Sequence, residues 1–156
     1  MEIEKKFLIK SLPNDLEHYP HKVIEQAYLS TEPVVRIRKS DEDYILTYKS
    51  KGFLAREEYN MPLTKEAYYH LREKADGNII SKTRYLLPLA DNLTIELDIF
   101  NPPFETLVLA EVEFLSVEQA NHFIPPDWFG EDVTYSPEYH NSYLSAQNTS
   151  NSMGTE

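Results

Sequence analysis

The sequence predicts a mainly β protein of the α+β class: an eight-stranded antiparallel β-barrel tunnel with a charged lumen and flanking helices. Two observations lead to this prediction. Eight segments have the composition and alternation of strands and are separated by turn-forming residues. Within these segments charged residues recur at every second position, where strand side chains share one face of a sheet. A barrel is favoured over an open sheet because closure leaves no strand edge unpaired.

The expected strands follow one another along the chain with few interruptions. They cover residues 1–10, 23–29, 33–39, 43–49, 54–61, 78–88, 93–99 and 107–115. Turn residues separate them, among them Lys51-Gly52, Asp76-Gly77-Asn78 and Asn101-Pro102-Pro103. Glycine, proline, asparagine and aspartate supply the backbone angles that such turns need.

Two helices are expected between or after these strands. The first begins after Thr64, whose hydroxyl suits the N-cap position. Its apolar face would consist of Ala67, Leu71 and Ala75. The second begins at Ser116, because Ser-Val-Glu-Gln matches a capping box with Gln119 at the third helical position.

A third helix is expected near the C-terminus. It would open with Ser136 as N-cap and Pro137 at the first helical position, and run to about Ala146. The residues that follow are polar and show no periodicity. We therefore expect one folded domain over residues 1–147 and a disordered tail over residues 148–156.

Composition excludes several classes of function. The chain of 156 residues has 26 acidic residues and 15 lysines and arginines, a net charge of −11. This charge argues against binding to nucleic acid or to an anionic membrane. Cysteine is absent, which excludes disulfides, zinc thiolates and thiol nucleophiles. With only four glycines and no P-loop, any phosphate chemistry must use side chains.

Since no signal peptide or membrane-length apolar run is visible, a cytoplasmic location is expected.

The alternating charges allow two interpretations. They could form the solvated outer face of a sheet, which is the common arrangement. The signs, however, are sorted by strand: the purely basic pairs are Arg36/Arg38 and Lys82/Arg84, and the purely acidic pairs are Glu96/Asp98 and Glu111/Glu113. Surfaces that serve solubility tend to mix signs. We therefore favour a barrel whose outer face is apolar and covered by helices, and whose lumen is charged.

A charged lumen constrains what it can contain, because unpaired buried charges are strongly destabilising. Arginine offers a planar fork that matches phosphate oxygens. Carboxylates at alternate positions suit a hard divalent cation such as Mg²⁺, which also bridges phosphates. Both groups in one cavity predict a site for a metal and a polyphosphate, where catalysis rests on positioning and charge neutralisation.

The motifs that carry these charges are similar to those of one known family. The chain opens with Glu2-Ile3-Glu4-Lys5-Lys6, an ExExK sequence. The motifs that follow are Arg36-Ile37-Arg38, Thr47-Tyr48-Lys49, Arg56-Glu57-Glu58-Tyr59, Lys82-Thr83-Arg84-Tyr85, Glu96-Leu97-Asp98 and Glu111-Val112-Glu113-Phe114. In this order they resemble the CYTH superfamily, also called triphosphate tunnel metalloenzymes, and in particular its short bacterial branch. The resemblance extends from residue 1 to about residue 146.

The resemblance implies an eight-stranded tunnel that binds a triphosphate and Mg²⁺ or Mn²⁺. Residues expected to bind the triphosphate are Lys6, Arg36, Arg38, Lys49, Arg56, Lys82 and Arg84. Residues expected to hold metal are Glu2, Glu4, Asp98, Glu111 and Glu113, with Glu58 and Glu96 as further acidic lining. Lys6 and Tyr28 are the expected catalytic residues. Lys6 would touch the substrate and the attacking water, whereas Tyr28 either relays a proton or is a packing aromatic.

Three functions follow from this resemblance and from the residues. The favoured one is metal-dependent hydrolysis of inorganic tripolyphosphate to pyrophosphate and phosphate. The alternatives are an adenylate cyclase or thiamine triphosphatase acting on an organic triphosphate, and a polyphosphate-binding module without catalysis. Relatives often carry lysines in the C-terminal helix where His140 and Ser142 stand, so its contact with substrate is left open. Neither nucleic acid nor membrane is an expected partner, and a homodimer is left open.

Overall fold

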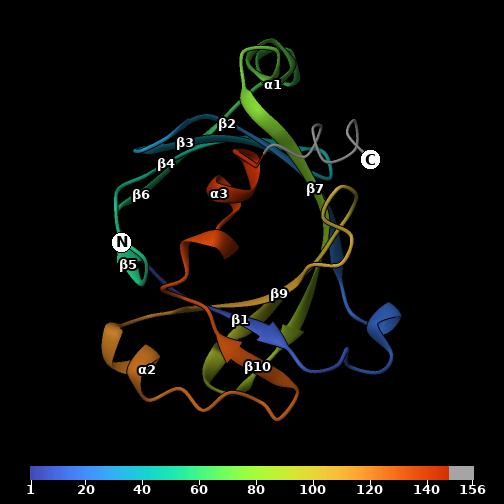
Figure 1. Cartoon of the computed structure of the whole chain (residues 1–156), viewed down its shortest axis with the longest axis vertical. Coiled ribbons are helices and arrows are strands. Elements are labelled where there is room, and N and C mark those ends of the chain that lie inside the picture. The colour runs from blue at the N-terminus through green and yellow to red at the C-terminus, as the bar shows by residue number, and fades with distance from the viewer. Residues whose placement is uncertain (148–156) are drawn as a thin grey trace.

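The computed structural model describes residues 1–147, and they form one antiparallel sheet that curls into a barrel (Figure 1). Its ten strands are β1 (Glu2–Ile9), β2 (His21–Thr31), β3 (Val34–Ser40), β4 (Asp43–Lys49), β5 (Ala55–Arg56), β6 (Glu58–Pro62), β7 (Asp76–Pro88), β8 (Thr94–Phe100), β9 (Val108–Phe114) and β10 (Phe129–Asp132). The helices are α1 (Lys65–Arg72), α2 (Val117–Asn121) and α3 (Asn141–Ser145), with 3₁₀ turns η1 (Leu16–His18), η2 (Ala90–Asn92) and η3 (Pro137–Tyr139). The expected tail, residues 148–156, lies outside the described residues.

The strand order shows how the barrel closes. The strands lie in the order β10-β1-β9-β8-β7-β2-β3-β4-β6, and β5 pairs with the free edge of β1. Arg56 of β5 lies opposite Glu2, while Glu58 of β6 lies opposite Lys49 of β4. Only Glu57 separates β5 from β6. This short segment therefore joins the two ends of the sheet into a nearly closed barrel.

The mainly β barrel is confirmed, and two differences explain why ten strands replace eight. The expected strand 54–61 is divided at Glu57, because its two halves pair with different neighbours. The second difference is β10, which pairs with the end of β1 through Ile9 and Phe129. Gly130 in β10 would bring a Cβ to 3.3 Å from the carbonyl oxygen of Leu8, so this close pairing suits glycine. A four-residue strand with glycine at its second position has no detectable alternation.

The helix caps agree largely with the sequence. The Thr64 hydroxyl accepts a hydrogen bond from the Ala67 amide at 3.0 Å, as expected of an N-cap. Helix α1 ends at Arg72, however, so Ala75 lies beyond it. Ser116 likewise caps α2 by accepting from the Gln119 amide, but the Gln119 side chain accepts from the amide of the preceding Leu115 rather than from Ser116.

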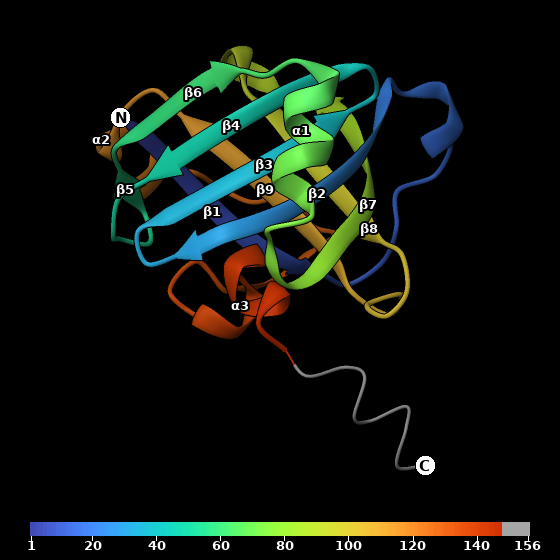
Figure 2. The ribbon, with the colours of Figure 1, turned by 90° about the horizontal axis from the view of Figure 1, so that it is seen from above.

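The expected third helix is wrong in its length. Residues 136–146 form η3 and α3, interrupted by His140 in an extended conformation (φ −82°, ψ 141°). Ser136 makes no side-chain cap bond. The interruption turns the chain, and α3 packs against β7 and β2. Figure 1 shows α3 within the ring of strands, and Figure 2 shows from the side that it lies at one end of the barrel.

Apolar residues cover the outside of the barrel and also close one end of its inside. Outside, α1 buries Tyr68 against Ala27 and Ile37 of the sheet. A second outer cluster lies around α2 and β10, formed by Ile3, Phe7, Leu97, Val112, Phe114, Ala120 and Phe129. Inside, an apolar plug closes the end at α3, formed by Tyr28, Val34, Ile80, Phe100, Leu109, Val133 and Leu144. The inner face is therefore charged over only part of its length.

No helix in the part of the chain that the structure describes combines the length and apolar character needed to cross a membrane.

Candidate active site

A cavity of about 300 Å³ opens inside the barrel beside the apolar plug. Its walls contain every site residue expected from the sequence except Asp98: Glu2, Glu4, Lys6, Tyr28, Arg36, Arg38, Lys49, Arg56, Glu58, Lys82, Arg84, Glu96, Glu111 and Glu113. The alternating charges therefore face inward. The apolar residues between them lie on the outside of the barrel, where the helices and loops cover them.

Strand register places charged residues of neighbouring strands side by side. Glu111 of β9 lies directly opposite Lys6 of β1 on one side and Glu96 of β8 on the other. Arg84 of β7 lies opposite Asp98 of β8. Directly opposed side chains in an antiparallel pair are within about 5.5 Å at their Cβ atoms. These strands therefore build one wall in which the acidic groups of β9 and β8 lie between the basic groups of β1 and β7.

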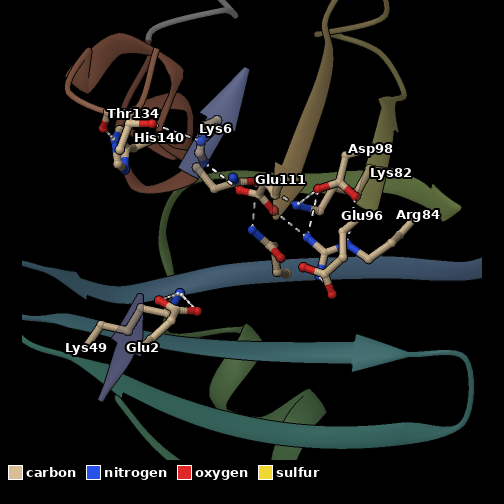
Figure 3. Close-up of polar contacts among 12 residues, drawn as sticks. Glu2, Lys6, Lys49, Lys82, Arg84, Glu96, Asp98, Glu111, Thr134 and His140 are labelled. Carbon is tan, nitrogen blue, oxygen red and sulfur yellow. Dashed lines mark hydrogen bonds and ion pairs between the residues drawn. The ribbon is translucent and has the colours of Figure 1, made fainter. Parts of the chain in front are cut away.

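Asp98 lies behind this wall rather than on it. Its carboxylate accepts from Arg84 Nε at 2.7 Å and Nη2 at 2.9 Å, and lies 2.7 Å from Lys82 Nζ. The side chain is 1% exposed, and both oxygens are engaged by cations (Figure 3). Burial opposes its ionisation, but Arg84 and Lys82 hold the pKa of Asp98 below its usual value. This position suits the orientation of two cations better than the ligation of a metal.

Glu111 is the most connected carboxylate of the cavity. It lies 2.7 Å from Lys6 Nζ and accepts a hydrogen bond from Arg84 Nη2 at 2.8 Å (Figure 3). Burial disfavours its charge, but these two cations hold the pKa of Glu111 well below its usual range. Burial likewise opposes the charge of Lys6, yet Glu111 and Glu4 raise its pKa. Lys6 and Glu111 are thus an ion pair throughout the neutral range.

Three carboxylates converge on one point of the cavity. Oxygen atoms of Glu4, Glu96 and Glu111 lie within 4.8 Å of one another. Burial, together with the charges of Glu111 and Glu2, raises the pKa of Glu4 to about 8. The nearby charges of Lys49 and Lys6 act in the opposite direction but do not offset burial and the neighbouring carboxylates. Three oxygen ligands at this spacing fit a hard divalent cation.

Arg36 and Arg38 on β3 form the basic part of the cavity. Within residues 1–147 neither lies within 4 Å of a carboxylate, unlike the other five basic residues of the walls. Arg36 donates from Nη2 to Thr47 Oγ1 at 3.3 Å, and its buried Nε has no partner. Burial lowers the pKa of Arg38, and the charges of Arg36 and Arg84 lower it further. Two adjacent uncompensated guanidinium groups are a site for an anion.

Lys82 and Tyr28 provide groups that can exchange protons. Burial, opposed by the charge of Asp98, lowers the pKa of Lys82 to about 7. Its Nζ lies at hydrogen-bond distance from both Asp98 and Asn141 Oδ1, the latter at 3.0 Å. The Tyr28 hydroxyl accepts from Gln26 Nε2 at 3.3 Å, so its own proton remains available for another acceptor.

Several wall residues were not expected from the sequence. Thr47 and Asn60 are among them, and both lie on the inner face of their strands, two residues from Lys49 and Glu58. Strict alternation would have identified these two. The segment His140, Asn141 and Ser142 also lines the cavity, so the C-terminal segment lies beside the charged side chains. Burial and the charge of Lys6 lower the pKa of His140 to about 4, so its imidazole is neutral.

This barrel with its inward-facing acidic and basic residues belongs to a known family. The model of the CYTH domain matches residues 1–123, and the chain is a member of the CYTH domain family. The resemblance seen in the sequence motifs is thereby confirmed.

Two relatives and one solved structure are similar over nearly the whole chain. The inorganic triphosphatase of Nitrosomonas europaea is 40% identical over 147 residues, which cover 92% of this chain and 95% of that protein. The inorganic triphosphatase of Acetivibrio thermocellus is 36% identical over 153 residues, 92% of each chain. The crystal structure of the inorganic triphosphatase NE1496 matches with a TM-score of 0.69 and 35% identity, covering 94% of this chain and 95% of that one.

Proposed function

We propose that this protein is a divalent-metal-dependent hydrolase that cleaves inorganic tripolyphosphate to pyrophosphate and phosphate inside the barrel. One observation carries the proposal: a carboxylate cluster of metal-ligand spacing and two arginines that have no carboxylate partner among residues 1–147 line the same cavity. The names of both relatives support it. A binder without catalysis would have little use for six lining glutamates, because they repel phosphate unless a cation lies between.

Glu4, Glu96 and Glu111 are the residues we assign to a Mg²⁺ or Mn²⁺ ion, since their oxygens converge and a cation would relieve the repulsion that Glu111 exerts on Glu4. Such an ion would neutralise phosphate oxygens and polarise the bond that breaks. Glu2 is less suited to this role, because the converging oxygens belong to Glu4, Glu96 and Glu111, while the Glu2 carboxylate pairs with Lys49 Nζ at 2.9 Å. Glu113, which is exposed, lies at the margin of the cavity.

Arg36 and Arg38 would bind the phosphate chain. Neither has a carboxylate partner in the described part of the chain, and a substrate with several negative charges supplies the missing partner. Lys49 and Arg56 share Glu2, so they keep part of their charge available for the same chain. A substrate gripped from several strands is held in one orientation, which lowers the entropic part of the barrier.

Lys82 is the residue best suited to accept a proton from the attacking water. A neutral lysine amine has two hydrogens and one lone pair, and Asp98 and Asn141 can accept both hydrogens. The lone pair then remains for a water in the cavity, and a pKa near 7 suits a general base. Lys6 stays protonated beside Glu111 and would stabilise negative charge at the reacting end, while Tyr28 would donate its free hydroxyl proton to a phosphate oxygen.

An adjoining hollow keeps organic triphosphates open as alternative substrates. It has a volume of about 450 Å³ and shares Val34, Arg56, His140 and Ser142 with the charged cavity. The aromatic rings of Phe53 and Tyr143 line it. An aromatic group attached to a triphosphate could stack there. Thiamine triphosphate and ATP should therefore be assayed beside tripolyphosphate, and cyclic AMP measured with ATP.

The metal requirement is the first test of the proposed function. We expect phosphate release from tripolyphosphate with Mg²⁺ or Mn²⁺ and none in excess chelator, because Glu4, Glu96 and Glu111 repel an anion when no cation joins them. Activity should return when metal is added beyond the chelator. Full activity with chelator present would contradict the proposal. Cyclic AMP formation from ATP at a comparable rate would favour the cyclase instead.

The cytoplasm, as the expected location, is consistent with the absence of cysteine.

The pKa of Glu4 predicts how this requirement depends on pH. Below about pH 8 the metal-free Glu4 carboxyl is protonated, so metal binding has to release that proton. The metal concentration for half-maximal activity should therefore rise as pH falls, by up to roughly tenfold per unit below that pKa. Metal titrations at pH 6.5 and pH 8.5 measure it. Equal half-maximal concentrations at both values would show that Glu4 carries no such proton. The pH dependence of the rate at saturating metal reports the protonation of Lys82 separately.

A further inference from the structure

A chain of hydrogen bonds runs from α3 into the basic part of the cavity. Asn141 Oδ1 accepts from Lys82 Nζ and from Gln26 Nε2, both at 3.0 Å. Gln26 Oε1 in turn accepts from Arg38 Nε at 2.8 Å and from Arg38 Nη2 at 2.6 Å. Gln26 is fully buried, and Asn141 and Lys82 are buried as well. The chain links four side chains that come from three strands and a helix.

The chemistry of its two ends permits one orientation of both amides. Arginine carries donors alone, so the oxygen of Gln26 must face Arg38, and the oxygen of Asn141 accepts from Lys82 Nζ, which has a hydrogen to donate in either protonation state. The remaining NH₂ group of Gln26 then meets the oxygen of Asn141, as its hydrogen bond requires. A rotation of the Gln26 amide by 180° would set its NH₂ group against the donors of Arg38 and its oxygen against the oxygen of Asn141. Gln26 is therefore locked with its oxygen on Arg38.

Arg38 differs from most other basic residues of the cavity, because the group that holds it, the Gln26 amide oxygen, is uncharged. Lys6, Lys49, Lys82 and Arg84 each lie within 3 Å of a carboxylate oxygen, which cancels much of their charge. Arg38 is held at least as closely, by two hydrogen bonds, but by a neutral amide oxygen. Its geometry is fixed while its full positive charge remains in the cavity. A glutamate has the same shape as glutamine and can accept the same two hydrogen bonds from Arg38, but it would cancel that charge and place an oxygen where Gln26 donates to Asn141.

We propose that Gln26 is a positioning residue that determines affinity for the phosphate chain: it orients the Arg38 guanidinium without neutralising it, and Asn141 of α3 locks its amide. The proposal rests on the proposed function, since it assumes a polyanionic substrate beside Arg38. Within residues 1–147, both side-chain hydrogen bonds of Arg38 go to Gln26.

The test compares two replacements of Gln26 that differ in charge and not greatly in size. Gln26→Glu should raise the KM for tripolyphosphate roughly 10- to 100-fold, the range for a hydrogen bond to a charged group, and more than it lowers kcat. Gln26→Met removes the two hydrogen bonds that orient Arg38 but leaves the charge of Arg38, so the KM of this variant should rise less than that of Gln26→Glu. Glu25→Gln is the matched control: it changes charge at the next residue, whose side chain binds Tyr68 and Arg72 on the outer face.

If Gln26 only supported packing, Gln26→Met should raise KM more than Gln26→Glu. The reason is that an apolar methionine among polar partners disturbs packing more than an isosteric glutamate. A KM within about twofold of wild type for Gln26→Glu overturns the proposal. Should Gln26→Glu fail to fold, Gln26→Met decides: an unchanged KM there overturns the proposal too. Thermal unfolding of each variant identifies misfolded protein.

A double-mutant cycle shows whether Gln26 acts through Arg38. In an Arg38→Ala background, Gln26→Glu should change KM less than about threefold, because its partner is gone. An undiminished effect overturns the proposal. Wild-type protein separates this inference from the proposed function. If the wild-type protein neither hydrolyses tripolyphosphate nor binds it in calorimetry, the proposed function and this inference both fail. If the wild-type protein is active and Gln26→Glu has the same KM, this inference alone fails.

Discussion

Replacing Glu111 with glutamine is expected to lower the kcat for tripolyphosphate roughly 10²- to 10³-fold, the loss typical of one positioned electrostatic group in an active site. Glu111 belongs to the carboxylate cluster with Glu4 and Glu96 and also holds Lys6 and Arg84. Glutamine keeps its shape but removes the charge that attracts the metal. It also offers an NH₂ group where two cations need acceptors, so Lys6 or Arg84 loses its position.

A metal titration separates the two parts of this effect. Raising Mg²⁺ or Mn²⁺ should restore part of the activity lost through weaker metal binding, and the remainder reports the displaced Lys6 and Arg84. Glu118→Gln is the control, since Glu118 is exposed on α2, far from the cavity walls. Steady-state kinetics and thermal unfolding of both variants are the measurements. Wild-type kinetics for Glu111→Gln would remove Glu111 from the reaction.

Replacing Arg36 with alanine is expected to raise the KM for tripolyphosphate roughly 10- to 100-fold. Arg36 is buried, has no carboxylate partner within the described chain, and carries an Nε without any partner. Substrate binding supplies that partner. Because Arg36 and Arg38 repel each other, the substrate-free variant should keep its thermal midpoint or gain slightly. Affinity would thus fall without a fall in stability.

Lys39→Ala is the matched control for Arg36. Lys39 lies on the same strand, but it faces outward and donates to the Tyr69 hydroxyl at 3.3 Å. If net charge alone governs affinity, both replacements should raise KM similarly. If the uncompensated charge inside the cavity governs it, Lys39→Ala should leave KM near that of wild type. Equal effects would contradict the role assigned to Arg36.

The alternation of residues accounts for how much of the site could be predicted. In a strand, the sequence period of two determines which side chains share a face, and the inward pairs such as Arg36/Arg38 and Glu111/Glu113 follow from it directly. The same rule places Glu96 and Asp98 on one face, yet it does not distinguish them by depth. Register decides that: Asp98 lies opposite Arg84 and is buried beneath it, whereas Glu96 lies opposite Glu111 and faces the cavity.

The alternation of residues does not predict the apolar plug or the position of the C-terminal segment. Ile80, Phe100 and Leu109 share a face with charged residues, and only the position of α3 along the barrel explains why that end of the lumen is apolar. The helix was expected to be continuous, but the extended His140 turns it onto β7 and brings Asn141 to Gln26. Contacts between residues 115 positions apart carry no signal in local periodicity.

By itself the sequence determined most of the strands, the face on which each charge lies and the sorting of acidic from basic pairs, because these depend on the backbone geometry of single strands. Only the tertiary structure decided which charges neutralise one another and which remain available. Arg38 and Arg84 read alike in the sequence, but Arg84 lies among Asp98, Glu96 and Glu111, while Arg38 has the neutral Gln26. The physical reason is that charge compensation depends on distances across strands, and closure of the barrel sets those distances.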